Sequence, residues 1–113
     1  MNSGSNLLDQ VRKEKLYNAL VFQLNKDFER AGLEAEFDAA FENQQLLRNL
    51  QAALYNLVVS DFESYLTLLY AIDVSEAKIK ALPDCEVHQL AEFVSVLILE
   101  REFKKVQFKN RTL

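Results

Sequence analysis

The sequence has little of what catalytic, metal-binding and disulfide-bonded proteins commonly rely on. Its 113 residues include one Cys, one His, one Pro, two Gly and no Trp. A single Cys excludes an internal disulfide and fits a reducing compartment. So few Gly and Pro argue against turn-rich β-sandwiches, collagen-like repeats and disordered linkers. The two Gly residues build neither a phosphate-binding loop nor a G-x-S-x-G motif.

Long apolar runs and a surplus of basic residues are also missing. No run approaches the roughly 18 apolar residues of a transmembrane helix, so we expect no contact with a membrane. The first six residues are small and polar, so we expect no signal peptide and a cytoplasmic location. The formal net charge is −4, and residues 31–76 carry −7 from eight acidic groups and one basic group. Because phosphate contacts need clustered Lys and Arg, we expect no nucleic-acid partner.

What the sequence does contain is apolar residues at helical spacing. Half of the residues are hydrophobic, which suffices for one small core in a chain of this length. The pattern predicts an all-α fold, a small helical bundle of four main helices and one short helix. Residues 1–6 are predicted to be a flexible N-terminal tail, and residues 7–113 a single helical domain.

The first helix is predicted over residues 7–31, with Ser5 or Asn6 as its N-cap. Its main stripe is Tyr17, Leu20, Val21, Leu24, Phe28 and Ala31. Gly32 is expected to end it in the left-handed conformation. Residues 33–43 are predicted to be a loop held by Phe37 and Phe41, with the start of the next helix as the alternative.

Four further segments are predicted from stripes, caps and breaks. A helix covers 44–59, and Ser60 with Glu63 has the spacing of a capping box for a helix over 61–72. The expected buried stripe of that helix is Phe62, Tyr65, Leu66, Leu69 and Ile72. A short helix follows Asp73 and ends before Pro83, and the last helix covers 85–108 with Asp84 as its cap. Residues 93–99 (FVSVLIL) also suit a strand, but their flanks favour a helix.

The last helix changes its apolar face midway. At 100° per residue, one face holds Val87, Leu90, Ala91, Phe93, Val94, Leu97 and Ile98, and the opposite face holds Val96, Leu99, Phe103 and Val106. The first helix has a similar minority opposite its main stripe. These two minority faces meet within one chain as core, or across a dimer interface, or form a groove for another helix or ligand. The candidate interaction residues are Leu8, Val11, Phe22, Val96, Leu99, Phe103 and Val106.

Little in the sequence points to catalysis or metal binding. Cys85, His88 and Glu92 share one side of a helix, but no second His or Cys completes a site. Acidic neighbours of Cys85 oppose a lowered thiol pKa. No pair among the 17 carboxylates stands out. We therefore assign no catalytic residue, expect no metal and no cofactor, and predict that the protein is not an enzyme.

Basic residues gather near the end of the last predicted helix. They are Lys104, Lys105, Lys109 and Arg111. Cations there interact favourably with the helix dipole. The alternative is that they meet an acidic surface of a partner, such as the acidic middle of another copy.

Two stretches resemble segments of known proteins. LLYAIDVSEAKI (68–79) and LILEREFKKVQFK (97–109) are similar to segments of small all-helical bacterial proteins that have no assigned function. The resemblance implies a helical cytoplasmic protein and carries over no functional residue.

Together these observations predict a non-enzymatic protein-interaction module whose partner is a protein, including another copy in a homodimer. The alternative is a helical carrier with an apolar cavity for a small ligand.

Overall fold

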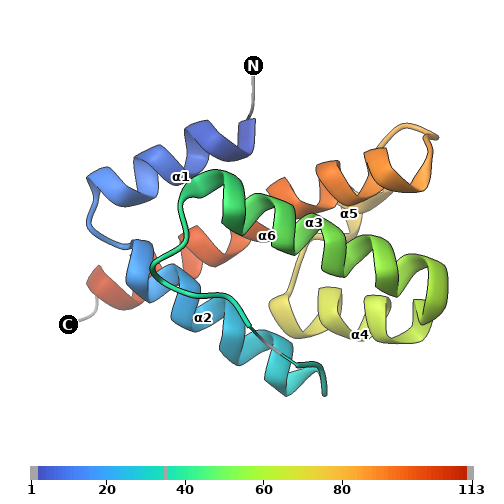
Figure 1. The fold of residues 1–113 in the computed structure, drawn as a ribbon, viewed down its shortest axis with the longest axis horizontal. Coiled ribbons are helices and arrows are strands. Elements are labelled where there is room, and N and C mark those ends of the chain that lie inside the picture. Colours follow the sequence, from blue (N-terminus) through green and yellow to red (C-terminus); the bar gives the residue numbers. More distant parts are fainter. Residues whose placement is uncertain (1–2, 35, 112–113) are drawn as a thin grey trace.

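The structure, a computed structural model, describes residues 3–34 and 36–111. These residues form six helices and no strand (Figure 1): α1 (Ser3–Lys13), α2 (Tyr17–Arg30), α3 (Asn43–Ser60), α4 (Phe62–Ile72), α5 (Glu76–Lys80) and α6 (Val87–Arg111). The predicted all-α class is confirmed. The predicted count of four main helices and one short helix is one too few. None of the six helices is long and apolar enough to cross a membrane.

The additional helix arises because the first predicted helix is broken after Lys13. The chain turns at Lys15, where φ is 61°, and continues as α2 from Tyr17. A lysine at this left-handed position gives no sequence signal, since Gly or Asn is the usual occupant. The predicted tail and caps are wrong too, because residues 3–6 form the first turn of α1. Residues 1–2 lie outside the described residues.

Arg12 ties α1 to the segment that precedes α3. Its Nε donates to Oδ1 of Asn43 at 2.7 Å, and Nη2 donates to the carbonyl of Phe41 at 2.9 Å. The guanidinium also lies 3.6 Å from the centroid of the Tyr17 ring, a cation–π contact. The Tyr17 hydroxyl donates to the same Phe41 carbonyl at 2.8 Å. This network holds α1 against the start of α2 and against the segment that precedes α3.

The end of α2 is as predicted. Gly32 has φ of +80°, its N–H donates to the Glu29 carbonyl at 2.9 Å, and the Leu33 N–H donates to the Phe28 carbonyl at 3.0 Å. This pair of bonds is the Schellman motif, which glycine favours because the left-handed conformation costs it little.

Residues 33–34 and 36–42 lie outside the helices, as the predicted loop over 33–43 requires, whereas Asn43 already belongs to α3. The Asn25 side chain holds the loop through two bonds to the backbone of Phe37, at 2.8 Å to the carbonyl and 3.1 Å from the N–H. The buried Phe37 ring packs edge-on against Phe28 with 5.0 Å between centroids. Phe41 is half-buried and accepts the bonds described above.

The caps of α4 and α5 differ by one or two residues from the predicted ones. Asp61 rather than Ser60 is the N-cap of α4, and it accepts from the Ser64 N–H at 3.2 Å. Asp73 ends α4 in the left-handed conformation instead of starting the next helix. Ser75 caps α5, which is the short helix predicted there.

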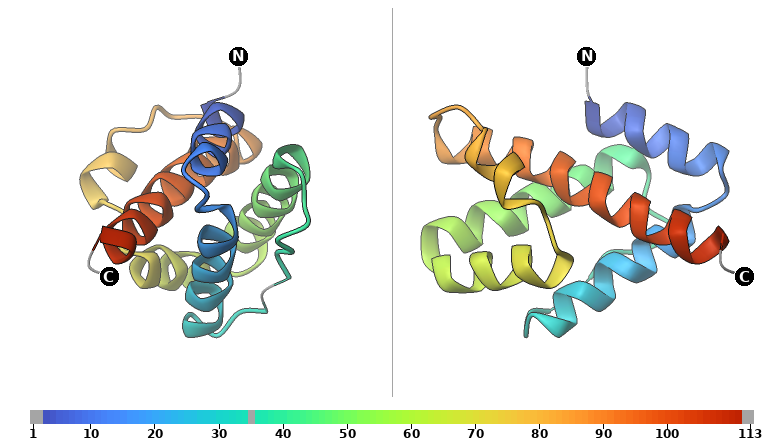
Figure 2. Two further views of the ribbon diagram at one scale, coloured as in Figure 1. Left: turned by 90° about the vertical axis from the view of Figure 1, so that its left-hand side faces the viewer. Right: turned by 180° about the vertical axis from the view of Figure 1, so that it is seen from behind.

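The last helix is the centre of the fold. α6 contacts α1, α2, α3 and α4, and Figure 2 shows it running between them. Its buried residues are Ala91, Val94, Ser95, Ile98, Leu99, Glu102, Phe103 and Val106. At 100° per residue these positions span one continuous side that includes Ser95 and Glu102, so the two opposite apolar faces predicted for this helix are the edges of one broad buried side. Phe93, predicted on the first face, is 40% exposed. The strand alternative for residues 93–99 is wrong, because they are helical.

Candidate functional site

Five of the seven candidate interaction residues lie in the core. Leu8, Val11, Leu99, Phe103 and Val106 are each at most 8% exposed. Val96 is half-buried and Phe22 is 69% exposed. Because α1 and α6 contact each other, the minority faces meet within one chain, which is one of the alternatives that the sequence left open. Phe22 is the most accessible of the seven.

A stripe of exposed apolar side chains runs along α4. Phe62, Leu66 and Tyr70 are 52%, 50% and 89% exposed, and their four-residue spacing places them on one side of the helix. We call these three residues the α4 stripe. The prediction that Phe62 and Leu66 are buried is wrong. α4 is apolar on more than one side, and its neighbours cover a side that does not include these two residues. Its buried residues are Tyr65, Leu68, Leu69 and Ile72.

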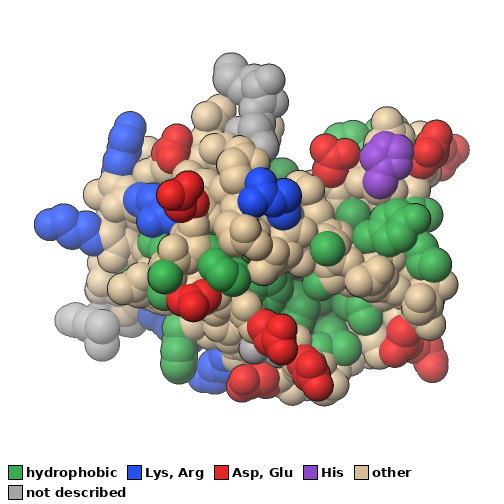
Figure 3. Space-filling view, in the orientation of Figure 1, with side chains coloured by type: hydrophobic (Ala, Val, Ile, Leu, Met, Phe, Trp, Pro, Cys, Tyr) green, Lys and Arg blue, Asp and Glu red, His purple; other side chains and the backbone are tan. Residues whose placement is uncertain are grey.

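Further exposed apolar and acidic residues lie on α3 and at the start of α4. Two residues of the packed neighbour α3, Tyr55 and Val59, are 43% and 59% exposed. Figure 3 shows hydrophobic side chains at the surface over α3 and α4. Asp61 and Glu63 at the start of α4 are exposed. Among the described residues, no Lys or Arg forms an ion pair with either carboxylate.

A mostly apolar cleft lies between α2 and the end of α6. Its volume is about 280 Å³. Its lining residues are Leu16, Ala19, Phe22, Gln23, Val106, Lys109 and Asn110. Lys109 is the one charged residue of that lining, and its Nζ donates to Oε1 of Gln23 at 2.6 Å. We call this feature the α2–α6 cleft.

Three charged residues meet in the interior between α2 and α6. Asp27 and Glu102 are completely buried. Nζ of Lys105 lies 2.7 Å from Oδ2 of Asp27 and 3.3 Å from Oε1 of Glu102. Gln23 donates to Oδ1 of Asp27 at 3.1 Å. Among the described residues, neither carboxylate oxygen of Glu102 has a hydrogen-bond partner by geometry.

A proton on Glu102 accounts for this arrangement. Asp27 pairs with Lys105 and also with the mostly exposed Arg30, whose Nη1 lies 3.3 Å from Oδ1, whereas the cation beside Glu102 is the shared Lys105. A buried carboxylate that shares its cation in this way is stabilised in its neutral form. Burial, and then the hydrogen bond to Asp27, raise the pKa of Glu102 to about 8. Burial opposes ionisation of Asp27 too, but hydrogen bonds from Glu102, Lys105 and Gln23 lower its pKa. Near neutral pH the raised pKa of Glu102 favours its protonated form, and the cluster joins α2 to α6.

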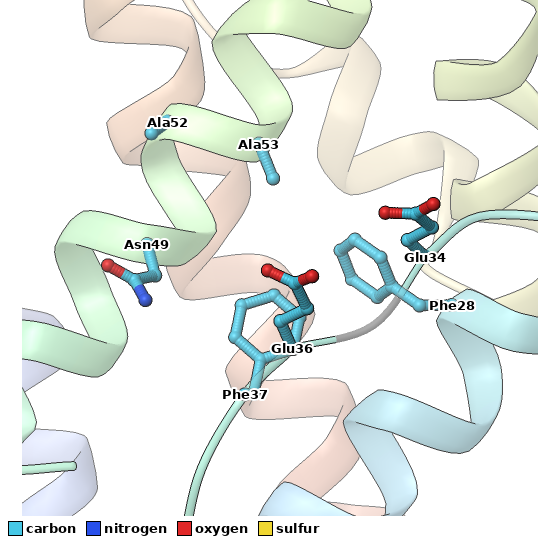
Figure 4. Close-up of a pocket in the computed structure, with 7 residues that line it drawn as sticks. All are labelled: Phe28, Glu34, Glu36, Phe37, Asn49, Ala52 and Ala53. Carbon is cyan, nitrogen blue, oxygen red and sulfur yellow. The ribbon is translucent and has the colours of Figure 1, made fainter.

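A second cleft lies between α2, the loop and α3 (Figure 4). Its volume is about 260 Å³. Its lining residues are Phe28, Glu34, Glu36, Phe37, Asn49, Ala52 and Ala53. Two aromatic rings form one side, two alanines of α3 leave space opposite, and the carboxylates of Glu34 and Glu36 lie beside the rings. Neither carboxylate has an ion-pair partner in the described part of the chain. We call this feature the loop cleft.

The structure does not assemble Cys85, His88 and Glu92 into a metal site. Cys85 is exposed and unpaired. Nδ1 of His88 lies 3.6 Å from Oε2 of Glu86, and both side chains are mostly exposed. Within residues 3–34 and 36–111, no three His, Cys, Asp or Glu residues are grouped in a way that could hold a metal ion.

Comparison of the chain with models of protein families, with curated proteins and with solved structures gives no match. The resemblance of residues 68–79 and 97–109 to bacterial helical proteins therefore stays a prediction.

Proposed function

We propose that this chain is a non-enzymatic protein-interaction module that binds other copies of itself through the α4 stripe. The observation that carries the proposal is the line of Phe62, Leu66 and Tyr70 on the surface, each at least half exposed. Contiguous exposed apolar side chains framed by polar groups are typical of protein–protein contacts. The interface considered from the sequence alone falls mainly in the core, so the proposal rests on α4 instead.

The free energy gained by burying the α4 stripe is smaller than the binding free energy of a stable complex. Full burial of one large apolar side chain contributes about 1.5–3 kcal/mol. A micromolar complex requires about 8 kcal/mol after the cost of association. Three side chains that are already partly covered do not supply this alone. The interface must therefore also include a complementary apolar surface on the second copy.

We also propose that the protein acts in the cytoplasm. Cys85 is exposed and forms no disulfide, and a free surface thiol fits a reducing environment. We therefore keep the cytoplasm as the place where the module acts.

Sedimentation velocity of the purified chain across the micromolar range tests the proposal. We expect the wild type to associate with increasing concentration and Leu66→Asp to remain monomeric, because the variant would bury a charge at the interface. Ala77→Asp is the matched control, since it adds the same charge at an exposed position of α5 and should associate like the wild type. A wild type that stays monomeric at every concentration would overturn the proposal.

A second candidate function, a carrier of a small ligand, is favoured by the loop cleft. Two Phe rings beside two carboxylates suit a small aromatic or aliphatic amine, whose cation would meet both the rings and the carboxylates. The cleft volume of about 260 Å³ limits the ligand to a small one.

Thermal unfolding with benzylamine tests this second candidate, with phenylacetate as the oppositely charged control. Benzylamine should raise the melting temperature of the wild type. It should have no effect on Ala53→Phe, which fills the cleft from α3, and phenylacetate should have none on either protein. Equal shifts by both compounds, or no shift by benzylamine, would contradict a carrier of this kind.

A further inference from the structure

We propose that the copies associate head to tail, with the α4 stripe of one copy seated in the α2–α6 cleft of the next. This inference rests on the proposed function, because it names the surface that receives the stripe. It is carried by three properties of the two surfaces: their shapes, their charges and their places in the fold.

The shapes are complementary. The α4 stripe presents large side chains that stand out from the surface, with Tyr70 89% exposed. The α2–α6 cleft is a recess of about 280 Å³ in which Leu16, Ala19 and Val106 supply apolar contact. A recess of this size accepts a Leu or an aromatic side chain. Phe22, 69% exposed beside the recess, adds an apolar edge that such a side chain would cover.

The charges are also complementary. The α4 stripe is accompanied by Asp61 and Glu63, within a stretch of net charge −7. The α2–α6 cleft is accompanied by Lys109, and the exposed Arg111 follows in the last turn of α6. Two stripes facing each other would bring like charges together, which is unfavourable. A stripe facing the cleft brings opposite charges together, and this decides between the two arrangements.

The positions of the two surfaces require a second molecule. α4 lies toward one end of the longest axis, whereas the start of α2 and the end of α6 lie toward the other, as Figures 1 and 2 show. The stripe and the cleft of one chain therefore cannot meet each other. A contact between two different surfaces of identical chains repeats, so it closes into a ring or continues as a chain.

Mixing two variants that each block one surface tests this arrangement. Leu66→Asp blocks the stripe and leaves the cleft intact, whereas Phe22→Asp blocks the cleft and leaves the stripe intact. Both positions are exposed, so both variants should keep the wild-type far-UV circular dichroism. Each variant alone should be monomeric by native mass spectrometry, with association weakened about tenfold or more. The mixture, with one variant labelled with ¹⁵N, should form a heterodimer of one copy of each and nothing larger.

A charge reversal tests the same contact by a second route. Glu63→Lys and Lys109→Glu should each weaken association, because each brings like charges together across the interface. The double variant should recover it, since the lysine of one copy then faces the glutamate of the next. Failure of the double variant to recover would contradict the pairing of these two surfaces.

The remaining outcomes separate this inference from the proposed function. If the wild type associates but the mixture of blocked variants stays monomeric, the head-to-tail contact is wrong and the self-association stands. If Phe22→Asp associates like the wild type, the cleft is not the receiving surface. If the wild type is monomeric, or is a monomer that carries a bound small molecule, both proposals fail.

Discussion

Asp27 of α2 and Lys105 of α6 form an ion pair in the interior, with 2.7 Å between Oδ2 and Nζ. The two residues are 78 positions apart in the chain, and the Asp27 carboxylate has no exposure to solvent. Such a pair adds less to stability than its short distance suggests, because both charges lose their hydration. Removal of the lysine alone is costly, since Asp27 then stays buried with only the mostly exposed Arg30 as its cation.

The variant Lys105→Met should therefore be strongly destabilised. Loss of the lysine leaves Asp27 with Gln23 and the mostly exposed Arg30. Breaking a buried pair on one side costs about 3–5 kcal/mol. Lys104→Met is the matched control, because that neighbour is exposed and its replacement should change stability by about 0.5 kcal/mol or less. Urea unfolding at neutral pH measures both, and equal midpoints would show that the pair contributes nothing.

The protonation of Glu102 makes a prediction about pH. Its pKa is raised from 4.5 to about 8 by folding, so the native state holds this proton more tightly than the unfolded state. The resulting stability is fully present below about pH 4.5 and is lost as the pH rises through about 8. Asp27, whose pKa is lowered, has the opposite effect on the free energy of unfolding. The stability that it contributes is present above its unfolded-state pKa and is lost as the pH falls into the acid range.

Urea midpoints between pH 5 and pH 8.5 measure this effect. The wild type should become steadily less stable over that range. Glu102→Gln should lack most of the decline, because the amide has nearly the size of the protonated acid, is neutral and does not titrate. A wild type and a variant with parallel pH profiles would show that Glu102 is ionised in the folded protein.

Asn25→Ala should loosen the loop that contains Phe37. The variant loses two hydrogen bonds of 2.8 and 3.1 Å to the Phe37 backbone, which leaves a partly buried donor and acceptor unpaired. The expected cost is about 1–3 kcal/mol. Asn18→Ala is the control, as an exposed asparagine of the same helix. Amide hydrogen exchange should become faster in residues 33–42 of the Asn25 variant only, and unchanged exchange there would contradict this role.

Phe103→Asp distinguishes a core position from an interface position. Phe103 is 8% exposed within one chain, so a charge there should unfold the protein or greatly lower its melting temperature. Phe108→Asp, five residues later and 69% exposed, should keep the helical signal and a melting temperature near that of the wild type. A folded Phe103→Asp variant that is merely monomeric would restore the interface interpretation of this face.

Local signals predicted the parts of the fold that depend on neighbouring residues. The Gly32 end of α2 and the loop held by Phe37 follow from left-handed geometry and from aromatic residues in an acidic segment. The apolar residues around the middle of the last predicted helix indicated a helix central to the core, and α6 contacts four of the other helices. The turn at Lys15 could not be predicted in this way, because the contacts of α1 with α3 and α6 hold it and not the type of the turning residue.

The candidate site was predicted less well, for a physical reason. The sequence shows that α4 is apolar on several sides but not which side its neighbours cover, so its pattern predicts that Phe62 and Leu66 are buried although both are exposed. The buried charges did leave a signal, since Asp27 follows the buried Leu24 by three residues and Glu102 follows the buried Leu99 by three. A carboxylate on the apolar side of each of two helices points to a shared polar contact between them.

The central place of α6 also bears on how the chain is made. Residues 87–111 contribute to the contacts of α1, α2, α3 and α4, yet they leave the ribosome after all of those helices. Until they emerge, the apolar sides of the earlier helices have no common neighbour to pack against. The nascent chain should therefore stay open to proteases and chaperones until α6 has emerged, and should become compact only then.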